Sequence, residues 1–162
     1  MRHVADHLKS HALLVANTPE FDLFGRSAFN RYYYATFLIV RAGLRQMNLV
    51  AESGEIAHAS IPDMLSGTVH KKLKRACGEA KKIGDNEAIS LFSTGAQAAR
   101  ELAALMNSAR ASRTTADYHP EMPIIISGNG FLLVTTSVNQ AQSWPHKADG
   151  LINSIAAAWR QL

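Results

Sequence analysis

The feature that most constrains the fold is a long apolar stripe of helical spacing between Pro19 and Met47. Apolar residues recur there on one broad face, namely Phe21, Phe24, Ala28, Tyr32, Ala35, Ile39 and Ala42. A stripe this long and rich in aromatic residues is typical of the central helix of a bundle. The segment therefore predicts a fold built mainly from α-helices.

Further helical segments surround this one and are separated by short breaks. Ser60 and Asp85 are expected to cap two of them at the N-terminus, and Gly84 is expected to end the first of these. A loop holding Ser53-Gly54 is expected over 48–59. The segments run from Arg2 to Ala16, from Ser60 to Ile83, from Asp85 to between Arg113 and Tyr118, and from Ser137 to Arg160. In the last of these, Pro145 and Gly150 can kink or split the helix. Along the first segment Val4, Leu8, Ala12 and Val15 recur at helical spacing and are the expected apolar face.

The pattern changes between the last two helical segments. Two apolar runs, 124–126 and 131–134, flank Ser127-Gly128-Asn129-Gly130 and predict a β-hairpin with an Asn-Gly turn. Because an isolated hairpin is marginal in water, it should pack on the helices or on a second chain. The expected architecture is a single domain over residues 1–162, an all-α, up-and-down bundle of four to five helices with a small β-hairpin before the last.

Composition excludes several classes of protein. Cys77 is the one cysteine among 162 residues, which excludes a disulfide framework and a cysteine-rich zinc site. No apolar run approaches the ~18 residues of a membrane span, and the first 17 residues lack the apolar stretch of a signal peptide. A cytoplasmic protein without a membrane partner is expected. The net charge of +4 is compatible with an anionic partner.

The segment Arg113–Pro120 carries the strongest chemical signal, because an arginine and a histidine flank the expected end of a helix. A histidine titrates near neutral pH and can take the proton from a 2′-hydroxyl or give one to a leaving 5′-oxygen of RNA. An arginine offers bidentate donors to the phosphate as its charge develops. The pair Arg113 and His119 therefore suits RNA cleavage without a metal.

The spacing of these residues leaves two readings open. Arg113 and Asp117 are four residues apart and can pair across one helical turn. Arg113 and His119 are six apart, so they can meet only if the helix ends before His119, as Pro120 suggests, or if two copies meet across a dimer axis. In the alternative reading, the Arg–Asp pair closes a helix end and the histidine is exposed in a loop.

Two blocks of sequence resemble the HEPN superfamily of small helical-bundle proteins. The first is Phe29-Asn30-Arg31-Tyr32-Tyr33-Tyr34-Ala35-Thr36-Phe37, and the second is Arg113-Thr114-Thr115-Ala116-Asp117-Tyr118-His119. Between them, His58 to Leu65 is similar to the histidine-containing entry to the third helix of that family. The order and length of the expected helices agree with the family over nearly the whole chain.

The resemblance implies a function and a set of site residues. Many HEPN proteins are metal-independent endoribonucleases whose signature is an arginine, four to six intervening residues and then a histidine, and Arg113 and His119 match it with five residues between them. Active members dimerise so that two motifs face one cleft, and many act as toxins of toxin–antitoxin pairs or in phage defence. This chain would then be a homodimer that binds RNA, with an antitoxin or other protein partner possible and without a metal or cofactor. The supporting residues would be Arg110, Thr114, Asp117, Tyr118 and Arg31.

The tyrosine block and Arg31 allow more than one role. Tyr32, Tyr33 and Tyr34 span nearly three-quarters of a helical turn, so they cannot all face the core. One or two are expected in the core with their hydroxyls satisfied at its edge, and another can stack on a base. Arg31 can reach the cleft or neutralise an acid such as Asp117.

A basic stripe is expected on the segment that ends at Ile83. Lysines and arginines share one helical face, and apolar residues lie largely opposite them. Such a surface can follow a phosphate backbone, although solvated lysine faces are also common on bundles. The candidate RNA contacts are Lys71, Lys74, Arg75 and Lys82.

Two other functions compete with ribonuclease activity. A non-catalytic HEPN module would bind a partner protein or nucleic acid, with the Arg–Asp pair as an architectural element. A weaker alternative is metal binding by His3, His7 and His11, which recur every four residues on the first helix. Without a cysteine beside them, these histidines are expected to form a polar face instead.

Overall fold

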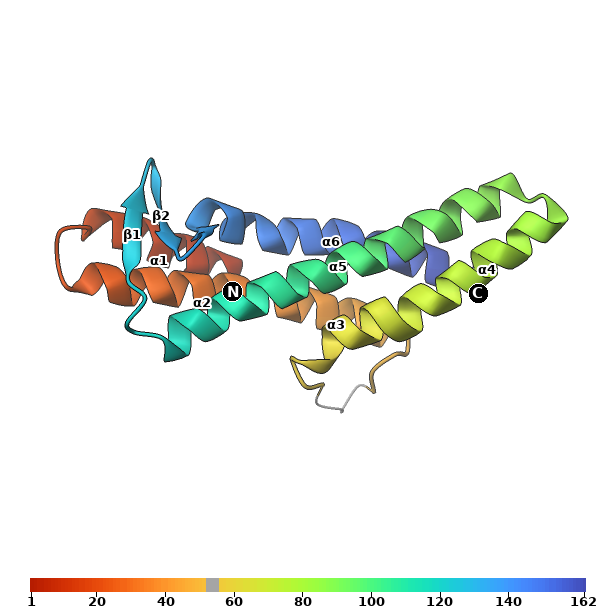
Figure 1. Ribbon diagram of the computed structural model, residues 1–162, viewed down its shortest axis with the longest axis horizontal. Coiled ribbons are helices and arrows are strands. Elements are labelled where there is room, and N and C mark those ends of the chain that lie inside the picture. The colour runs from red at the N-terminus through yellow and green to blue at the C-terminus, as the bar shows by residue number, and fades with distance from the viewer. Residues whose placement is uncertain (52–55) are drawn as a thin grey trace. The chain divides into compact units, whose positions relative to one another are not determined.

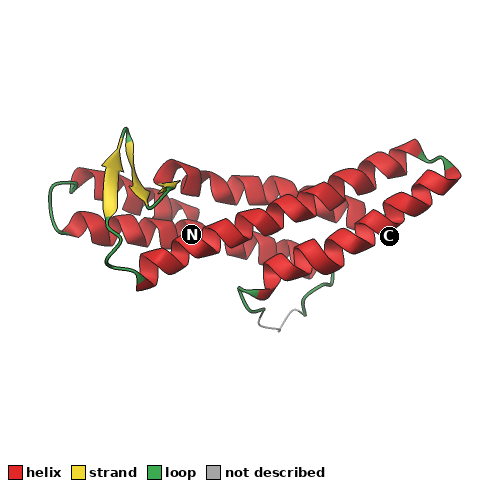
Figure 2. Ribbon diagram, in the orientation of Figure 1, coloured by secondary structure: helices red, strands yellow, loops and turns green. Residues whose placement is uncertain are grey.

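A computed structural model describes residues 1–51 and 56–162, and it confirms the expected fold class. Helices dominate the chain, and a small antiparallel sheet precedes the last helix (Figure 2). Ser53 and Gly54, expected in a loop, lie outside the described residues. The elements in order are α1 (Arg2–Leu14), α2 (Glu20–Gln46), α3 (Ser60–Met64), a π-helical turn η1 (Leu65–Val69), α4 (His70–Ile83), α5 (Asn86–Tyr118), β1 (Ile124–Ser127), β2 (Gly130–Leu133), β3 (Thr136–Ser137) and α6 (Val138–Trp159) (Figure 1).

Two of the three expected helix-end signals are confirmed and one is wrong. The carboxylate of Asp85 accepts the backbone N–H of Ala88 at 3.0 Å, as an N-cap should, and Gly84 ends α4 in the left-handed conformation. Ser60 is instead the first residue of α3, and its hydroxyl bonds backward to the carbonyl of Ala57 at 2.8 Å. The hydroxyl therefore closes the turn before the helix and does not cap it.

The hairpin is confirmed, but its turn lies one residue earlier than expected. Ser127 faces Gly130 across the antiparallel pair, so Gly128 and Asn129 form the two-residue turn. Gly128 has a φ of 56°, a left-handed value that glycine adopts without a steric penalty. The Asn-Gly pair read from the sequence therefore straddles the end of the turn. A short strand that the sequence did not predict, β3, pairs with β2.

The chain folds as two compact units, each built from separate stretches of sequence. The first unit contains Met1–Phe37 and Ser108–His146, and the second contains Leu38–Asn107 and Lys147–Leu162. Helices α2, α5 and α6 each contribute residues to both units. Pro145 lies inside α6, which is assigned as one helix from Val138 to Trp159. The sequence left open whether the helix is split at this proline, and the backbone continues through it as one helix.

In the first unit, aromatic side chains pack the sheet against α2. The Phe131 ring on β2 lies edge-on to the rings of Phe21 and Phe29, at centroid distances of 5.6 and 6.0 Å. Gly25 faces this contact, and a Cβ atom there would lie 3.1 Å from Ile124 of β1. The absence of a side chain at Gly25 thus lets the sheet approach the helix closely.

A polar network joins α1, α2 and α6 at the edge of the same core. Tyr32 and Tyr33 are buried and Tyr34 is half-buried, as expected for part of the tyrosine block. The hydroxyl of Tyr32 donates to Asp6 at 2.7 Å, and the amide of Gln142 donates to the same carboxylate oxygen at 2.8 Å. Burial and this bond to Asp6 raise the pKa of Tyr32, so the hydroxyl stays protonated.

The apolar face expected on α1 is partly wrong. Ala12 is buried as expected, but Val4 is 49% exposed, and Ala5 is fully buried in its place. In α2 the expected stripe is buried at Phe21 and Ala28, whereas Ala42 is exposed. Toward the C-terminal end of α2, the buried apolar residues are instead Val40 and Leu44.

The second unit has a core rich in aliphatic side chains. Leu44, Leu65, Leu73, Leu102 and Ile155 are fully buried, and the indole N–H of Trp159 donates to the carbonyl of Met47 at 3.2 Å. None of the described helices has the length and apolar character needed to cross a membrane.

Candidate functional site at the exit of α5

The ion pair expected between Arg113 and Asp117 is confirmed. Arg113 Nε lies 2.7 Å from Asp117 Oδ2, one turn apart near the end of α5. The N–H of Arg113 Nε is not aligned for a hydrogen bond, so its contact with Asp117 is electrostatic. Asn30 of α2 donates its amide to the other oxygen of Asp117. Asp117 of α5 is therefore also bound by a side chain of α2.

The surroundings of Arg113 keep its guanidinium charged. Burial opposes the charge, but Asp117 and Tyr118 outweigh it and raise the pKa of Arg113. The ring centroid of Tyr118 lies 5.5 Å from the guanidinium carbon, and Tyr118 itself is 65% exposed. Arg113 thus lies between a carboxylate and an exposed aromatic ring.

The same helix face brings a second arginine near the tyrosine block. Burial raises the pKa of Tyr33 to about 12, while the charges of Arg110 and Arg113 act in the opposite direction. Arg110 and Arg31 are exposed, and Thr114 is half-buried. Asp117 is engaged by Arg113 and Asn30, so the role of neutralising this acid does not fall to Arg31.

His119 follows the last residue of α5 and pairs with a carboxylate that the sequence reasoning did not single out. Its Nδ1 lies 2.8 Å from Glu121 Oε1, and its side chain is 46% exposed. A hydrogen bond from a backbone N–H lowers the pKa of Glu121, and the bond with His119 lowers it further. Both favour the ionised form of Glu121. A carboxylate two residues after a histidine at a helix exit is the sequence signal that could have indicated this pair.

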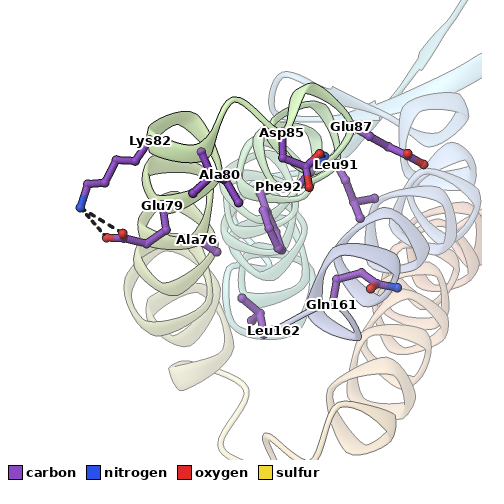
Figure 3. A pocket seen from close by; sticks show the side chains of 12 residues that line it. Ala76, Glu79, Ala80, Lys82, Asp85, Glu87, Leu91, Phe92, Gln161 and Leu162 are labelled. Carbon is purple, nitrogen blue, oxygen red and sulfur yellow. Dashed lines mark hydrogen bonds and ion pairs between the residues drawn. The ribbon is translucent and has the colours of Figure 1, made fainter.

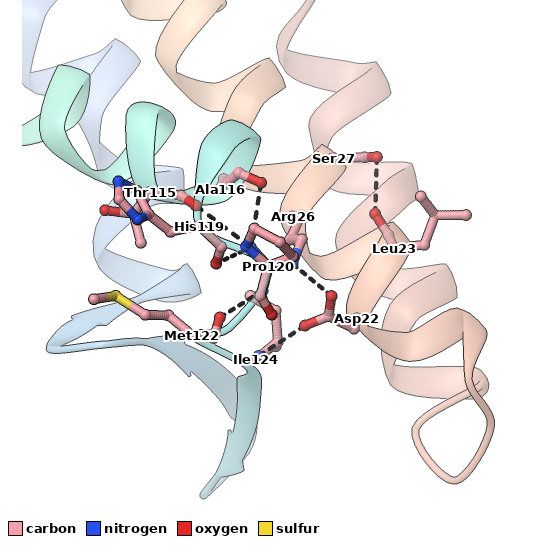
Figure 4. Close-up of polar contacts among 10 residues, drawn as sticks. All are labelled: Asp22, Leu23, Arg26, Ser27, Thr115, Ala116, His119, Pro120, Met122 and Ile124. Atoms are coloured by element: carbon pink, nitrogen blue, oxygen red, sulfur yellow. Dashed lines mark hydrogen bonds and ion pairs between the residues drawn. The ribbon is translucent and has the colours of Figure 1, made fainter.

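Arg26 of α2 organises the loop that carries His119 (Figure 4). Its guanidinium donates to the carbonyls of Ala116, His119 and Met122 at 3.2, 3.1 and 2.5 Å, and also reaches those of Thr115 and Pro120. The C-terminal end of a helix has unpaired carbonyls and a negative partial charge, which a buried cation satisfies. Sequence reasoning missed Arg26 because the carbonyls that it binds are about 90 residues away, although an acid four residues earlier, Asp22, was a local signal.

Asp22 extends this arrangement to the sheet. One of its carboxylate oxygens lies 2.5 Å from Arg26 Nε, and the other accepts the backbone N–H of Ile124 at 2.9 Å. The chain between α5 and β1 is thus fixed at both ends by α2 (Figure 4).

The contacts divide the predicted site into two neighbouring groups. One joins Arg113, Asp117, Tyr118 and Asn30, and the other joins His119, Glu121 and Arg26. Asn30 and Arg26 are four residues apart on α2. Within the described part of the chain, no hydrogen bond or ion pair joins Arg113 to His119.

The predicted RNA contacts lie on α4 in the second unit and are all exposed, namely Lys71, Lys74, Arg75 and Lys82. They differ in their partners, because Lys82 Nζ lies 3.0 Å from both carboxylate oxygens of Glu79. Lys72, beside the stripe, places its ammonium 4.5 Å from the Trp159 ring centroid. Because an anion would compete with Glu79 for Lys82, Lys74 is more accessible to an anion than Lys82.

An open groove of about 860 Å³ lies in the second unit between the ends of α4 and α5 (Figure 3). Phe92 and Leu91 line its apolar part, while Glu79, Asp85 and Glu87 lie around it. Lys82 borders this groove beside Glu79, but the two residues of the proposed catalytic pair lie in the first unit.

The spacing of the histidines of α1 in the sequence makes them candidate ligands of a metal ion. No group of three metal-ligating side chains occurs among residues 1–51 and 56–162. The rings of His7 and His11 stack at 6.5 Å, and His11 packs edge-on against Phe24 at 4.3 Å. His3 and His7 are exposed, as expected for a polar helix face, whereas His11 is half-buried against Phe24.

No known protein family, curated protein or solved structure matches this chain. The resemblance to HEPN proteins therefore depends on the residues quoted above.

Proposed function

We propose that this protein is a metal-independent endoribonuclease of HEPN type that acts as a homodimer. The observation that carries the proposal is the contact between His119 Nδ1 and Glu121 at 2.8 Å on an exposed loop. A carboxylate on Nδ1 favours the tautomer with the proton on that nitrogen, which leaves Nε2 as the base. This is the arrangement a catalytic histidine needs.

In the proposed reaction, His119 takes the proton of a ribose 2′-hydroxyl. The 2′-oxygen attacks the adjacent phosphorus, and the bond from phosphorus to the 5′-oxygen breaks. The leaving 5′-oxygen receives a proton from an imidazolium, either the same one or that of the partner copy. The products are a 2′,3′-cyclic phosphate and a 5′-hydroxyl.

Arg113 would stabilise the charge that develops on the phosphate, with Arg110 as a second contact one turn earlier. Asp117 and Asn30 would orient the Arg113 guanidinium, because Asp117 contacts Arg113 and is itself held by Asn30. Orientation of donors before the reaction is the main source of such stabilisation. In a homodimer, Arg113 of one copy can serve beside His119 of the other.

The test is cleavage of structured and unstructured RNA in excess EDTA by the parent protein and by His119→Ala. Cleavage by the parent alone, with 2′,3′-cyclic phosphate ends, is expected. A matched control is His146→Ala, which alters a histidine outside the loop and should retain activity. Equal cleavage by the parent and His119→Ala would overturn the role of His119.

A second candidate function is a non-catalytic module that binds nucleic acid or a partner protein such as an antitoxin. The observation that favours it is the ion pair between Arg113 and Asp117, because such a pair can close the end of α5 without taking part in catalysis. RNA binding that weakens with salt, without cleavage, would support this module. Failure of both binding and cleavage would favour a protein partner.

A further inference from the structure

We infer that the outer edge of β1 is a pairing surface between two copies of this chain, with Ile126 facing Ile126 across a two-fold axis. The sheet has the strand order β1-β2-β3, so β1 is paired on one side only among the described residues. Edge strands of this kind recruit further strands unless charges, prolines or bulges protect them. This inference rests on the homodimer of the proposed function and names its interface, which RNA cleavage alone does not test.

The register of the hairpin determines which backbone groups point outward. A two-residue turn closes on a hydrogen-bonded pair, here Ser127 and Gly130, and such pairs alternate along an antiparallel ladder. Ile125 is therefore the next residue bonded to β2, whereas Ile124 and Ile126 direct their N–H and C=O groups to the outer edge. The N–H of Ile124 confirms this, because it donates to Asp22 and not to β2.

Asp22 limits the edge to a short pairing site. With the Ile124 N–H occupied, Ile126 is the one residue of β1 that offers both a donor and an acceptor outward. Two copies placed antiparallel across a two-fold axis at Ile126 satisfy both groups by exchanging two hydrogen bonds. A longer extended peptide would instead meet the Asp22 carboxylate at the next outward N–H.

The side chains also favour a second copy as the occupant. Ile125 and Ile126 are 58% and 50% exposed, and the residues from Ile124 to Gly130 carry no charge. A chain with a net charge of +4 repels its own copies over most of its surface, but two such edges can meet without like-charge contacts. Ile126 would then face Ile126 of the second copy in an apolar cross-strand pair, while Ile125, on the opposite face of the strand, would lie across from Ser127.

The first experiment measures the mass of the protein in solution, by light scattering or sedimentation, from low to high micromolar concentration. We expect a dimer that dissociates on dilution for the parent and for Ile126→Val, which keeps the N–H and the branched side chain. Ile126→Pro removes the outward donor and should be monomeric with an unchanged helical circular dichroism spectrum. A parent protein that stays monomeric at high concentration overturns the inference.

A second measurement does not depend on the folding of the proline variant. Ile126→Cys in a Cys77→Ala background should form an intermolecular disulfide, because facing residues of such a pair have Cα atoms about 5.5 Å apart. Ile83→Cys in the same background is the control, since Ile83 is 80% exposed and lies in the other unit. Equal cross-linking of both variants would show that the pairing is not at β1. RNA cleavage by a protein that lacks this pairing would leave the role of His119 standing and would remove β1 as the interface of the proposed homodimer.

Discussion

Arg26 and Asp22 lie one turn apart on α2 and together fix the chain that leaves α5. Arg26 Nε lies 2.5 Å from Asp22 Oδ2, and the Arg26 guanidinium donates to the carbonyls at the end of α5. The other oxygen of Asp22 holds the first residue of β1, Ile124. The pair thus sets the position of His119, which lies between these two attachments.

Arg26→Ala should destabilise the protein by about 2–4 kcal/mol, because it leaves a carboxylate and several carbonyls without their cation. The Arg26 side chain is 11% exposed, although water can reach Asp22, which is 42% exposed, and replace part of these bonds. Urea unfolding measures the change. Arg31→Ala, on an exposed site of the same helix, should change stability by less than about 0.5 kcal/mol. Similar losses of stability in the two variants would contradict the role of Arg26 in fixing the end of α5.

The long helices and the hairpin could be predicted because their signals are local, whereas β3 was not predicted. The long stripe of α2, the capping by Asp85 and the stop at Gly84 each depend on residues within one or two turns. The face of α1 was harder to predict, since only the packed structure decides that Ala5 and not Val4 faces the core. Small residues carry little hydrophobic signal in a sequence.

The candidate site could be predicted only in part. Arg113 and Asp117 are neighbours on one helix, so their spacing predicts their contact. The contacts of Asn30 with Asp117 and of Arg26 with the exit loop join residues far apart in sequence. Their geometry depends on how α2 packs against α5, and no local pattern encodes it.

Tyr32→Phe should lower the free energy of unfolding by about 1–2 kcal/mol at neutral pH, because Asp6 loses one of its donors. Burial opposes ionisation of Asp6, but the bonds from Tyr32 and Gln142 outweigh it and hold its pKa below the usual 3.8. A depressed folded pKa contributes stability that is complete above pH 3.8 and is lost as pH falls through the folded value. The difference between parent and variant should therefore shrink in strong acid.

Urea unfolding of Tyr32→Phe and the parent at neutral and strongly acidic pH tests this expectation. Tyr118→Phe is the control, since Tyr118 is exposed and has no contact with Asp6. A Tyr32→Phe difference that stays constant into acid would show that the lost bond to Asp6 is not its cause.

Glu121→Gln should slow RNA cleavage if His119 acts as the base. The amide can still accept a bond from Nδ1, but it no longer stabilises the imidazolium that forms. The loss should be smaller than the ~10²–10⁴-fold expected for His119→Ala, since the imidazole remains. The measurement is the single-turnover rate against pH, with Glu20→Gln as a control on an exposed acid of the same chain. An unchanged rate for Glu121→Gln would show that the His119–Glu121 contact does not serve catalysis.

Lys74→Ala and Lys82→Ala should differ in their effect on RNA binding if α4 follows a phosphate backbone. Each phosphate contact with single-stranded RNA contributes a slope of about −0.7 to the logarithm of the binding constant against that of salt concentration. Lys74 is exposed, and its removal should flatten the slope by about this amount. Lys82 is held at 3.0 Å by both oxygens of Glu79, and the carboxylate repels an approaching phosphate, so its removal should change the slope less. Binding titrations at several salt concentrations measure both slopes. Equal slopes for the two variants would mean that RNA responds to the net charge of the protein and not to a surface on α4.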